Sequence, residues 1–389
     1  MARKAPSSTK SKASADASAT LSSESASAST PPAAPPPSLN AVTRSFGAIF
    51  GQDHALTVLR SVIASGRVHH AWIFHGPEGV GKRTTALAFA AQLLTPADAT
   101  EQERARVSIL LEHGAHPDLQ VVTKAHSKFH DEADVRKLKQ TSIPVDVVRR
   151  FVVEPARLAP QIRTNAPAAK VFVIDEAELM NPAAQNALLK TLEEPAERTV
   201  IILCTSQESA LLATIRSRSQ RVPFVPLSDD AMTQWMDDEG VRGERDWLIR
   251  FADGSPGAVR SGLAAGVLAW RDALDPMLAR MRQGQYVPEF APTAHALIDD
   301  WADAHVKANP TTTKEASKAR ALSWLLRVID VPVRSWVRAS VSGGEAKVEA
   351  AARAVDALRA VERMIDDSIQ PQFAFEQAAS EIVRAMSVR

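Results

Sequence analysis

A glycine-rich segment that ends in lysine is the part of the sequence best suited to phosphate chemistry. The pattern G-x-x-x-x-G-K-[ST] is met at Gly76, Gly81 and Lys82, with a further glycine at Gly79. Backbone N–H groups of such a loop cradle phosphates at the N-terminus of a helix, and the lysine reaches the terminal phosphate. The segment therefore predicts a nucleotide-binding loop.

One position departs from this motif. The motif requires a small hydroxyl that holds Mg²⁺, but the sequence has Arg83 there, and Thr84 points about 100° away on a helix. A guanidinium about 4 Å from Mg²⁺ is repelled by roughly 4 kcal/mol per unit charge at an effective dielectric constant of about 20. We expect Arg83 to turn to solvent or to pair with a phosphate oxygen. Binding of ATP or ADP is then weak or absent, and hydrolysis is inefficient.

Two acids follow an apolar run. Residues 170–174 read Lys-Val-Phe-Val-Ile and precede Asp175 and Glu176, the form of a buried parallel strand that delivers carboxylates to the edge of a sheet. In a nucleotide hydrolase, Asp175 would hold Mg²⁺ through water, and Glu176 would orient or deprotonate the attacking water. Alone, the segment equally fits an ordinary strand followed by a helix, whose dipole favours acidic residues at its N-terminus. Together with the loop, it favours a nucleotide site.

The elements that must position these residues occur in the expected order. Apolar residues at helical spacing predict a helix that begins near Gly51 and stops at Gly66. A strand is expected over 71–74, and the helix after the loop should end at Pro96. The loop therefore lies between a strand and a helix, the context that a phosphate-binding motif requires.

Residues 97–165 are the least regular part of the sequence. A buried strand is expected over 119–123 and a helix over 145–151, with a polar stretch at 124–142 between them. Four histidines at metal-like spacings fall here, at positions 113, 116, 126 and 130. No cysteine or well-placed carboxylate completes a tetrahedral set, so we expect a solvated loop and no zinc or other metal site.

Composition limits the remaining classes of function. The chain has 389 residues, 45% hydrophobic and 23% charged, as expected of a globular protein of roughly two to three domains. A formal net charge of +1 does not indicate nucleic-acid binding, although a local basic patch remains compatible with it. The single cysteine, Cys204, excludes an intramolecular disulfide. With no long apolar run and no secretory signal, a cytoplasmic protein without membrane contact is expected.

Three further segments carry a resemblance to a known family. They read Asn-Ala-Leu-Leu-Lys-Thr-Leu-Glu-Glu-Pro at 186–195, Thr-Val-Ile-Ile-Leu-Cys-Thr at 199–205 and Thr-Ile-Arg-Ser-Arg-Ser-Gln at 214–220. With Gly51-Gln52 and His69-His70-Ala71 upstream, they closely resemble AAA+ subunits of the bacterial DNA polymerase III clamp loader. The resemblance covers roughly residues 44–264 well and the C-terminal part weakly.

The expected domains follow from composition and from this resemblance. Residues 1–40 are dominated by Ser, Ala and Pro and indicate a disordered tail. The resemblance implies an α/β fold with an AAA+ P-loop core and a parallel sheet at 41–226. It also implies a small helical lid at 227–264 and an all-α collar, which joins clamp-loader subunits, at 265–389. Apolar stripes at helical spacing also indicate a helical bundle there.

Within the family, the sequence looks most like delta-prime, which shares its fold with the motor subunits tau and gamma but is commonly poor at ATP hydrolysis. Arg83 replaces the Mg²⁺-binding hydroxyl, and Gly257 stands where motor subunits carry an arginine that senses the γ-phosphate. No long proline-rich or basic extension follows the collar, as it would in tau. The four-cysteine zinc module frequent in both kinds of subunit is missing, which argues against zinc binding.

The resemblance also implies a role in a neighbour's chemistry. Ser217-Arg218-Ser219 resembles the Ser-Arg-Cys motif of the family, whose arginine is a trans-acting finger on ATP bound by the adjacent motor subunit. Without the resemblance, Arg218 would be a surface arginine that caps the preceding helix. Thr205 stands at the polar sensor position, but it also fits a strand-end hydrogen-bonding role.

The resemblance thus implies a delta-prime-like stator that helps to load the sliding clamp onto primed DNA, with Glu176 vestigial. The implied partners are the tau/gamma and delta subunits, with the clamp and primed DNA in the assembly. One alternative is an ATP-hydrolysing motor subunit, which measurable turnover would reveal. Another is a stand-alone DNA-binding AAA+ protein, which predicts salt-sensitive DNA binding by the chain alone.

Overall fold

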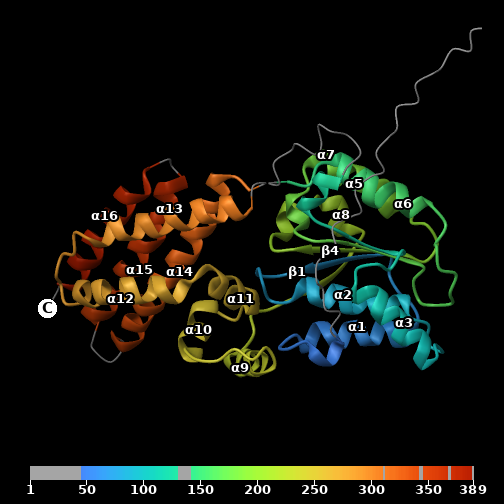
Figure 1. Cartoon of the computed structure of the whole chain (residues 1–389), viewed down its shortest axis with the longest axis horizontal. Coiled ribbons are helices and arrows are strands. Elements are labelled where there is room, and N and C mark those ends of the chain that lie inside the picture. The colour runs from blue at the N-terminus through green and yellow to red at the C-terminus, as the bar shows by residue number, and fades with distance from the viewer. Residues whose placement is uncertain (1–44, 130–141, 310–311, 341–344, 367–368, 388–389) are drawn as a thin grey trace, which may run out of the picture. The chain divides into compact units, whose positions relative to one another are not determined.

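The structure is a computed structural model that describes residues 45–129, 142–309, 312–340, 345–366 and 369–387 (Figure 1). The predicted tail at 1–40 and His130 lie outside the described residues.

A parallel five-stranded sheet, in the order β2-β3-β4-β1-β5, organises the N-terminal half of the described chain. The strands are β1 Ala71–His75, β2 Leu119–Val122, β3 Lys170–Ile174, β4 Thr199–Thr205 and β5 Gln220–Pro223. His75 pairs with Thr205, and Ile174 with Leu203, so the carboxyl ends of β1, β3 and β4 meet at one edge. The glycine-rich loop and the two acids therefore leave the same edge of the sheet.

Side chains of successive strand residues point into two separate apolar cores, as the period of two requires. Trp72 and Phe74 belong to the core beneath the first two helices, whereas Ile73 belongs to the core on the opposite face. The helices of this half are α1 Asp53–Ser65, α2 Lys82–Leu94, α3 Glu101–Glu112, α5 Val145–Val148, α6 Glu154–Arg157, α7 Pro182–Glu193 and α8 Ala213–Ser217. Both faces of the central strands are thereby buried.

The elements predicted around the loop are confirmed. Helix α1 stops at Gly66, whose backbone is left-handed at φ 65° and whose N–H donates to the Ile63 carbonyl. Strand β1 is one residue longer than predicted, and α2 ends just before Pro96. The strand predicted over 119–123 is β2.

The region 97–165 differs from its prediction in three respects. Helix α3 was not predicted, although Thr100 and Glu103 form a capping box that is visible as T-x-x-E in the sequence. The helix predicted over 145–151 runs on to Arg157 through a π-helical segment, Arg149–Val153. The expected solvated histidine loop is wrong for two side chains: His116 and His126 are buried.

Those two histidines satisfy backbone groups. The His116 ring nitrogen Nδ1 accepts from the Asp118 N–H, and the His126 Nδ1 accepts from the Thr123 N–H. Burial lowers the pKa of both rings, in His126 to about 4, which keeps the rings neutral. They are therefore structural parts of the turns on either side of β2.

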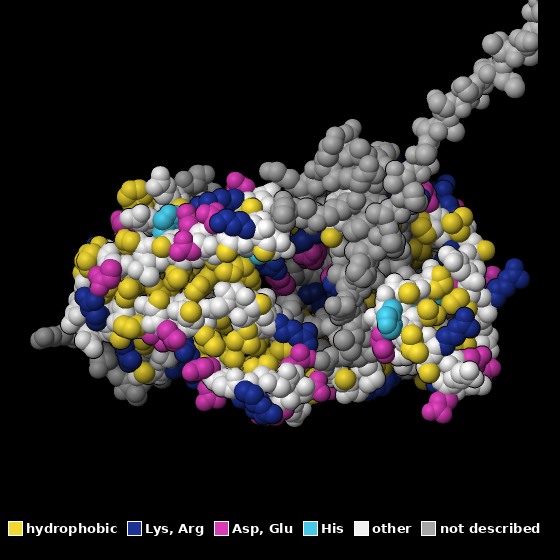
Figure 2. Space-filling view, in the orientation of Figure 1, with side chains coloured by type: hydrophobic (Ala, Val, Ile, Leu, Met, Phe, Trp, Pro, Cys, Tyr) yellow, Lys and Arg dark blue, Asp and Glu magenta, His cyan; other side chains and the backbone are white. Residues whose placement is uncertain are grey.

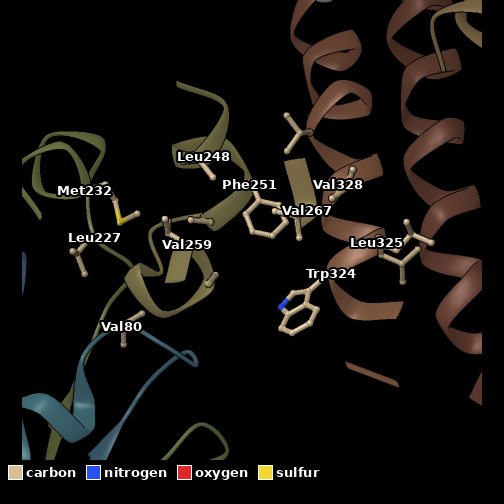
Figure 3. Packing of buried hydrophobic residues seen from close by; sticks show 14 of the residues in the cluster. Val80, Leu227, Met232, Leu248, Phe251, Val259, Val267, Trp324, Leu325 and Val328 are labelled. Atoms are coloured by element: carbon tan, nitrogen blue, oxygen red, sulfur yellow. The ribbon is translucent and has the colours of Figure 1, made fainter. Parts of the chain in front are cut away.

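The described chain beyond β5 is entirely helical, as predicted. The helices are α9 Asp229–Asp238, α10 Arg245–Ala252, α11 Pro256–Ala265, α12 Val267–Arg282, α13 Phe290–Ala308, α14 Lys314–Ser340, α15 Glu345–Asp366 and α16 Pro371–Met386. Helix α10 packs against α14, and Phe251 and Val267 lie beside the part of α14 that carries Trp324 (Figure 3). Among the described helices, none combines the length and apolar character needed to cross a membrane.

Candidate nucleotide site and subunit-edge arginine

The loop between β1 and α2 has the backbone of a phosphate-binding loop. Gly76 and Gly79 adopt φ 148° and φ 76°, conformations that favour glycine. A Cβ atom on Gly76 would lie 2.1 Å from the Phe224 carbonyl oxygen, so the residue that follows β5 leaves no room for a side chain there. The loop glycines therefore serve both the turn and its close contact with neighbouring backbone.

Lys82 is folded back onto this loop. Its Nζ donates to the carbonyl oxygens of Gly76, at 2.7 Å, and of Pro77, at 2.6 Å. The side chain is buried, and burial lowers the pKa of the amine. A phosphate that binds here must therefore replace carbonyl contacts that Lys82 already makes.

Arg83 is partly exposed, and its guanidinium points toward Asp175. Its Nη1 lies 3.5 Å from Asp175 Oδ2. Burial raises the pKa of the Asp175 carboxyl, and the Arg83 charge opposes that shift. Burial of the Asp175 carboxylate explains why Arg83 faces it, because a buried charge needs a counter-ion. The guanidinium therefore stands beside the carboxylate that would hold Mg²⁺ through water.

Glu176, the candidate general base, is also paired. Its Oε1 lies 2.8 Å from Lys124 Nζ, which follows the end of β2. Nothing in the sequence pattern marks Lys124, because the contact depends on β2 and β3 being neighbours in the sheet. An attacking water would have to compete with this lysine for the Glu176 carboxylate.

Thr205 and Glu178 complete the polar edge of the sheet. Thr205 is fully buried, and its hydroxyl oxygen accepts from the Gln207 N–H at 3.0 Å, the strand-end role noted as the alternative. Glu178 accepts hydrogen bonds from the N–H and hydroxyl of Ser206. Burial, the largest single influence, raises the pKa of Glu178, but the hydrogen bonds from Ser206, the Glu178 backbone N–H and Thr205 together lower the pKa below its ordinary value.

The N-terminus of α11 contacts the loop directly. The Gly257 N–H donates to the Gly79 carbonyl at 2.9 Å, and the Ser255 hydroxyl donates to the Glu78 carbonyl at 2.9 Å. A Cβ on Gly257 would lie 2.7 Å from Gly79 Cα. The absence of a side chain at 257 is therefore a packing requirement of this contact.

A buried amide joins the loop to the segment that leads into α9. Gln52 donates to the carbonyls of Val80, at 3.2 Å, and Val225, at 2.8 Å, and accepts from the Val225 N–H. From the sequence, Gln52 was noted only as part of the family resemblance and was assigned no role. It holds the two segments that flank the site in a fixed register.

The loop, the start of α11 and the carboxyl ends of β3 and β4 contribute residues to the lining of a cavity of about 730 Å³. In the space-filling view, Lys and Arg side chains lie close to Asp and Glu side chains in a hollow of the surface (Figure 2). Gly76 and Arg218 do not line this cavity. The predicted site residues that do are Gly79, Gly81, Lys82, Arg83, Thr84, Asp175, Glu176 and Thr205.

The cavity suits phosphate better than a metal ion. The loop and Lys82 offer donors, whereas the Asp175 and Glu176 carboxylates, which Mg²⁺ chemistry needs, already face cations. Across the described ranges, no group of three His, Cys, Asp or Glu side chains is placed to hold a metal ion. The residues present therefore fit a nucleotide and fit its Mg²⁺ poorly.

Arg218 lies apart from this cavity, directly after α8. Its Nη2 lies 3.0 Å from Glu193 Oε1 at the end of α7, and its Nη1 donates to the Thr214 carbonyl at 3.1 Å. Both side chains are partly exposed, at 38% and 49%. The arginine thus caps α8 and pairs with an acid that the sequence pattern did not indicate as its partner.

A parallel sheet of this order, with a phosphate-binding loop after β1, an acidic pair after β3 and a following helical region, defines the AAA+ class of P-loop proteins. Residues 51–228 match the family model described as DNA polymerase III, delta subunit. This segment is similar to subunits of DNA polymerase III, with delta' and gamma/tau among its relatives.

Three relatives illustrate the match. Subunit delta' of Pseudomonas aeruginosa is 36% identical over 196 residues, 48% of this chain and 53% of the relative. Subunit gamma/tau of Mycobacterium tuberculosis is 30% identical over 221 residues, 54% and 35% of the two chains. Subunit tau of Salmonella typhimurium is 32% identical over 310 residues, 74% and 42% of the two chains. The chain thus spans between 35% and 53% of the length of these relatives.

Among solved structures, a gamma subunit-related protein of DNA polymerase III from Thermotoga maritima is similar, with 17% identity and a TM-score of 0.42. The similarity covers 86% of this chain and all of the other chain.

Proposed function

We propose that the chain is a delta-prime-like stator of the DNA polymerase III clamp loader. In this role it assembles in the cytoplasm with tau/gamma and delta subunits, hydrolyses no ATP itself and helps to load the sliding clamp onto primed DNA. Arg218 acts on ATP bound by the adjacent motor subunit. Similarity to both delta' and gamma/tau relatives supports the clamp-loader role.

The contact between Arg83 and Asp175 is the observation that carries the assignment to a stator. A metal-dependent hydrolase needs the Asp175 carboxylate for its hydrated Mg²⁺, and here an arginine of the same chain takes that place at 3.5 Å. The pairing of Glu176 with Lys124 adds to the same effect. Gly257, which supplies no cation to the loop, is a third contribution.

Steady-state ATP hydrolysis by the isolated full-length chain tests this proposal. We expect turnover well below roughly 1 s⁻¹, the low end of ordinary enzymes. Replacement of Arg83 by Thr should strengthen binding of the Mg²⁺–nucleotide complex more than it increases hydrolysis, because Gly257 still supplies no cation. Arg83→Gln removes the positive charge without adding a hydroxyl. It therefore separates the effect of relieving the repulsion of Mg²⁺ from the effect of adding a hydroxyl ligand for Mg²⁺.

Turnover near 1 s⁻¹ by the unmodified chain would contradict the stator assignment and favour the second candidate, a motor subunit. That candidate draws its support from the presence of Lys82, Asp175 and Glu176 in one cavity. A stand-alone DNA-binding role instead requires tight, salt-sensitive binding of DNA by the chain without partners.

A further inference from the structure

One face of α14 brings unbalanced positive charge to the nucleotide cavity. Arg320 and Arg327 lie about two helical turns apart, with Ser323 between them, and all three line the cavity. Among the described residues, neither guanidinium has a carboxylate or hydrogen-bond partner; Arg320 stacks over the Trp324 ring at 5.6 Å. These two arginines are defined here as the α14 arginines.

The other cations of the cavity are already engaged. Lys82 bonds loop carbonyls, Arg83 faces Asp175, and Lys124 faces Glu176. Arg260 of α11 pairs with Glu239 at 2.6 Å and lies over the Trp235 ring. Among the described residues of the lining, the positive charge that faces no carboxylate therefore belongs to the α14 arginines and to Lys82, which loop carbonyls hold.

Packing fixes this face of α14 at the cavity. Leu325 and Val328 of α14 are fully buried, so the helix turns its polar side away from its own core. Helix α10 packs on α14, and α11 touches the loop through Gly257 and Gly79. A continuous series of contacts thus connects the α14 arginines to the phosphate-binding loop.

Position 257 supplies no cation to the cavity. No side chain can be placed at Gly257 while α11 contacts the loop, because a Cβ atom would lie 2.7 Å from Gly79 Cα. We propose that Arg320 and Arg327 bind the phosphate groups of a nucleoside di- or triphosphate in this cavity. The assignment deepens the proposed function, because it gives the stator a nucleotide site whose phosphate contacts come from α14.

The size and lining of the cavity fit this ligand. About 730 Å³ lies within the range of roughly 300–1,000 Å³ that small-molecule sites occupy. Ser255, Ser261 and Thr313 add hydroxyl groups to the lining, and Ile49, Phe50 and Leu227 add apolar surface. Arginine binds phosphate through charge-assisted, often bidentate hydrogen bonds, which Arg320 and Arg327 can supply.

Calorimetric titration of the full-length chain with ADP, and separately with pyrophosphate, tests the proposal. The double variant Arg320→Ala/Arg327→Ala should bind both ligands at least about tenfold more weakly, as loss of charge-assisted hydrogen bonds predicts. Arg338→Ala is the matched control, because Arg338 lies exposed on the same helix and does not line the cavity. The control should bind both ligands like the unmodified chain.

Several results would overturn the assignment. Equal affinity in the double variant and the unmodified chain would do so, as would absence of ADP and pyrophosphate binding by the unmodified chain. Loss of ADP binding with pyrophosphate binding retained would show that the arginines do not contact phosphate. Binding of single-stranded DNA that depends on these arginines, without ADP binding, would assign them to nucleic acid instead.

Two further measurements keep the outcome interpretable. A double variant with glutamine in place of alanine preserves more of the helix surface, and melting curves identify any variant that fails to fold. Clamp loading by an assembly that carries Arg218→Ala tests the stator role independently. Failure of one proposal therefore leaves the other measurable.

Discussion

At the scale of single residues, one substitution changes the chemistry of the loop through a contact that the sequence pattern does not contain. Arg83 was recognisable as a departure from the motif, but its partner was not, because Asp175 becomes its neighbour only when β1 and β3 are placed on either side of β4. Electrostatic repulsion of Mg²⁺ was the expected consequence. A guanidinium 3.5 Å from the carboxylate adds direct competition for that group.

Arg218 carries a prediction about another subunit. Replacement by Ala should leave the melting curve nearly unchanged, because a partly exposed ion pair contributes little to folding. It should lower ATP hydrolysis at the neighbouring motor site by roughly 10³-fold or more, since an arginine finger is worth 10³ to 10⁵ in rate. Clamp loading onto primed DNA by the reconstituted complex is the measurement.

Arg221→Ala is the matched control for that experiment. Arg221 lies three residues further on and pairs with Glu208, so it tests for a general effect of removing an arginine near α8. If the Arg218 variant loads clamps at the unmodified rate, Arg218 is a helix-capping residue and no finger.

His126 predicts a pH dependence of stability. Its pKa in the folded protein is about 4, below the ordinary 6.5, because it is buried. Between those values the unfolded chain binds a proton that the folded chain does not, so stability is lost as pH falls from about 6.5 to 4. The loss from this group reaches about 3 kcal/mol.

Chemical denaturation of the His126→Gln variant at a series of pH values measures the contribution of His126 to the pH dependence of the free energy of unfolding. The variant should lose less stability than the unmodified chain over that interval. His113→Gln, at an exposed histidine, should follow the unmodified chain. Identical pH profiles for all three proteins would remove His126 as the cause.

At the scale of elements, hydrophobic periodicity predicted the buried strands but not helix α3 or the π-helical segment at 149–153. Strands β1, β3 and β4 were predictable because they are short apolar runs buried on both faces. Helix α3 has a local signature, because Thr100 and Glu103 form its capping box. The π-helical segment at 149–153 has no such local signature, because the inserted residue reflects how α5 and α6 share one buried face.

The contact between α11 and the loop supports a prediction about Gly257. An arginine there should fail to restore ATP hydrolysis, because its Cβ would displace α11 from Gly79 before its guanidinium could reach a phosphate. Overpacking of this kind costs about 1–3 kcal/mol. Hydrogen exchange of amides in the loop and at the start of α11 should become faster in the Gly257→Arg variant.

Ala264→Arg places the same side chain at an exposed position of the same helix and is the control. Its exchange rates at the loop should match those of the unmodified chain. Protection that stays unchanged in the Gly257 variant, or ATP hydrolysis that it restores, would show that α11 can accommodate the side chain.

At the scale of the whole molecule, the class of fold was predictable and the state of the site was not. Motifs in the correct order along the chain predicted the sheet edge that gathers Lys82, Asp175 and Thr205. Three cations that decide its chemistry come from distant parts of the sequence: Lys124, Arg320 and Arg327. No local pattern marks them, because their role depends on tertiary packing.

In the action proposed for Arg218 on a neighbouring subunit, its contact with Glu193 makes the step an exchange of partners. Before the guanidinium can approach a phosphate, it must leave a carboxylate 3.0 Å away, so one anion replaces another and the number of ion pairs is conserved. The pair with Glu193 is partly exposed and weak, whereas a nucleoside triphosphate carries several negative charges, so the exchange favours the phosphate. Added salt screens this difference, and engagement of the arginine should weaken as ionic strength rises.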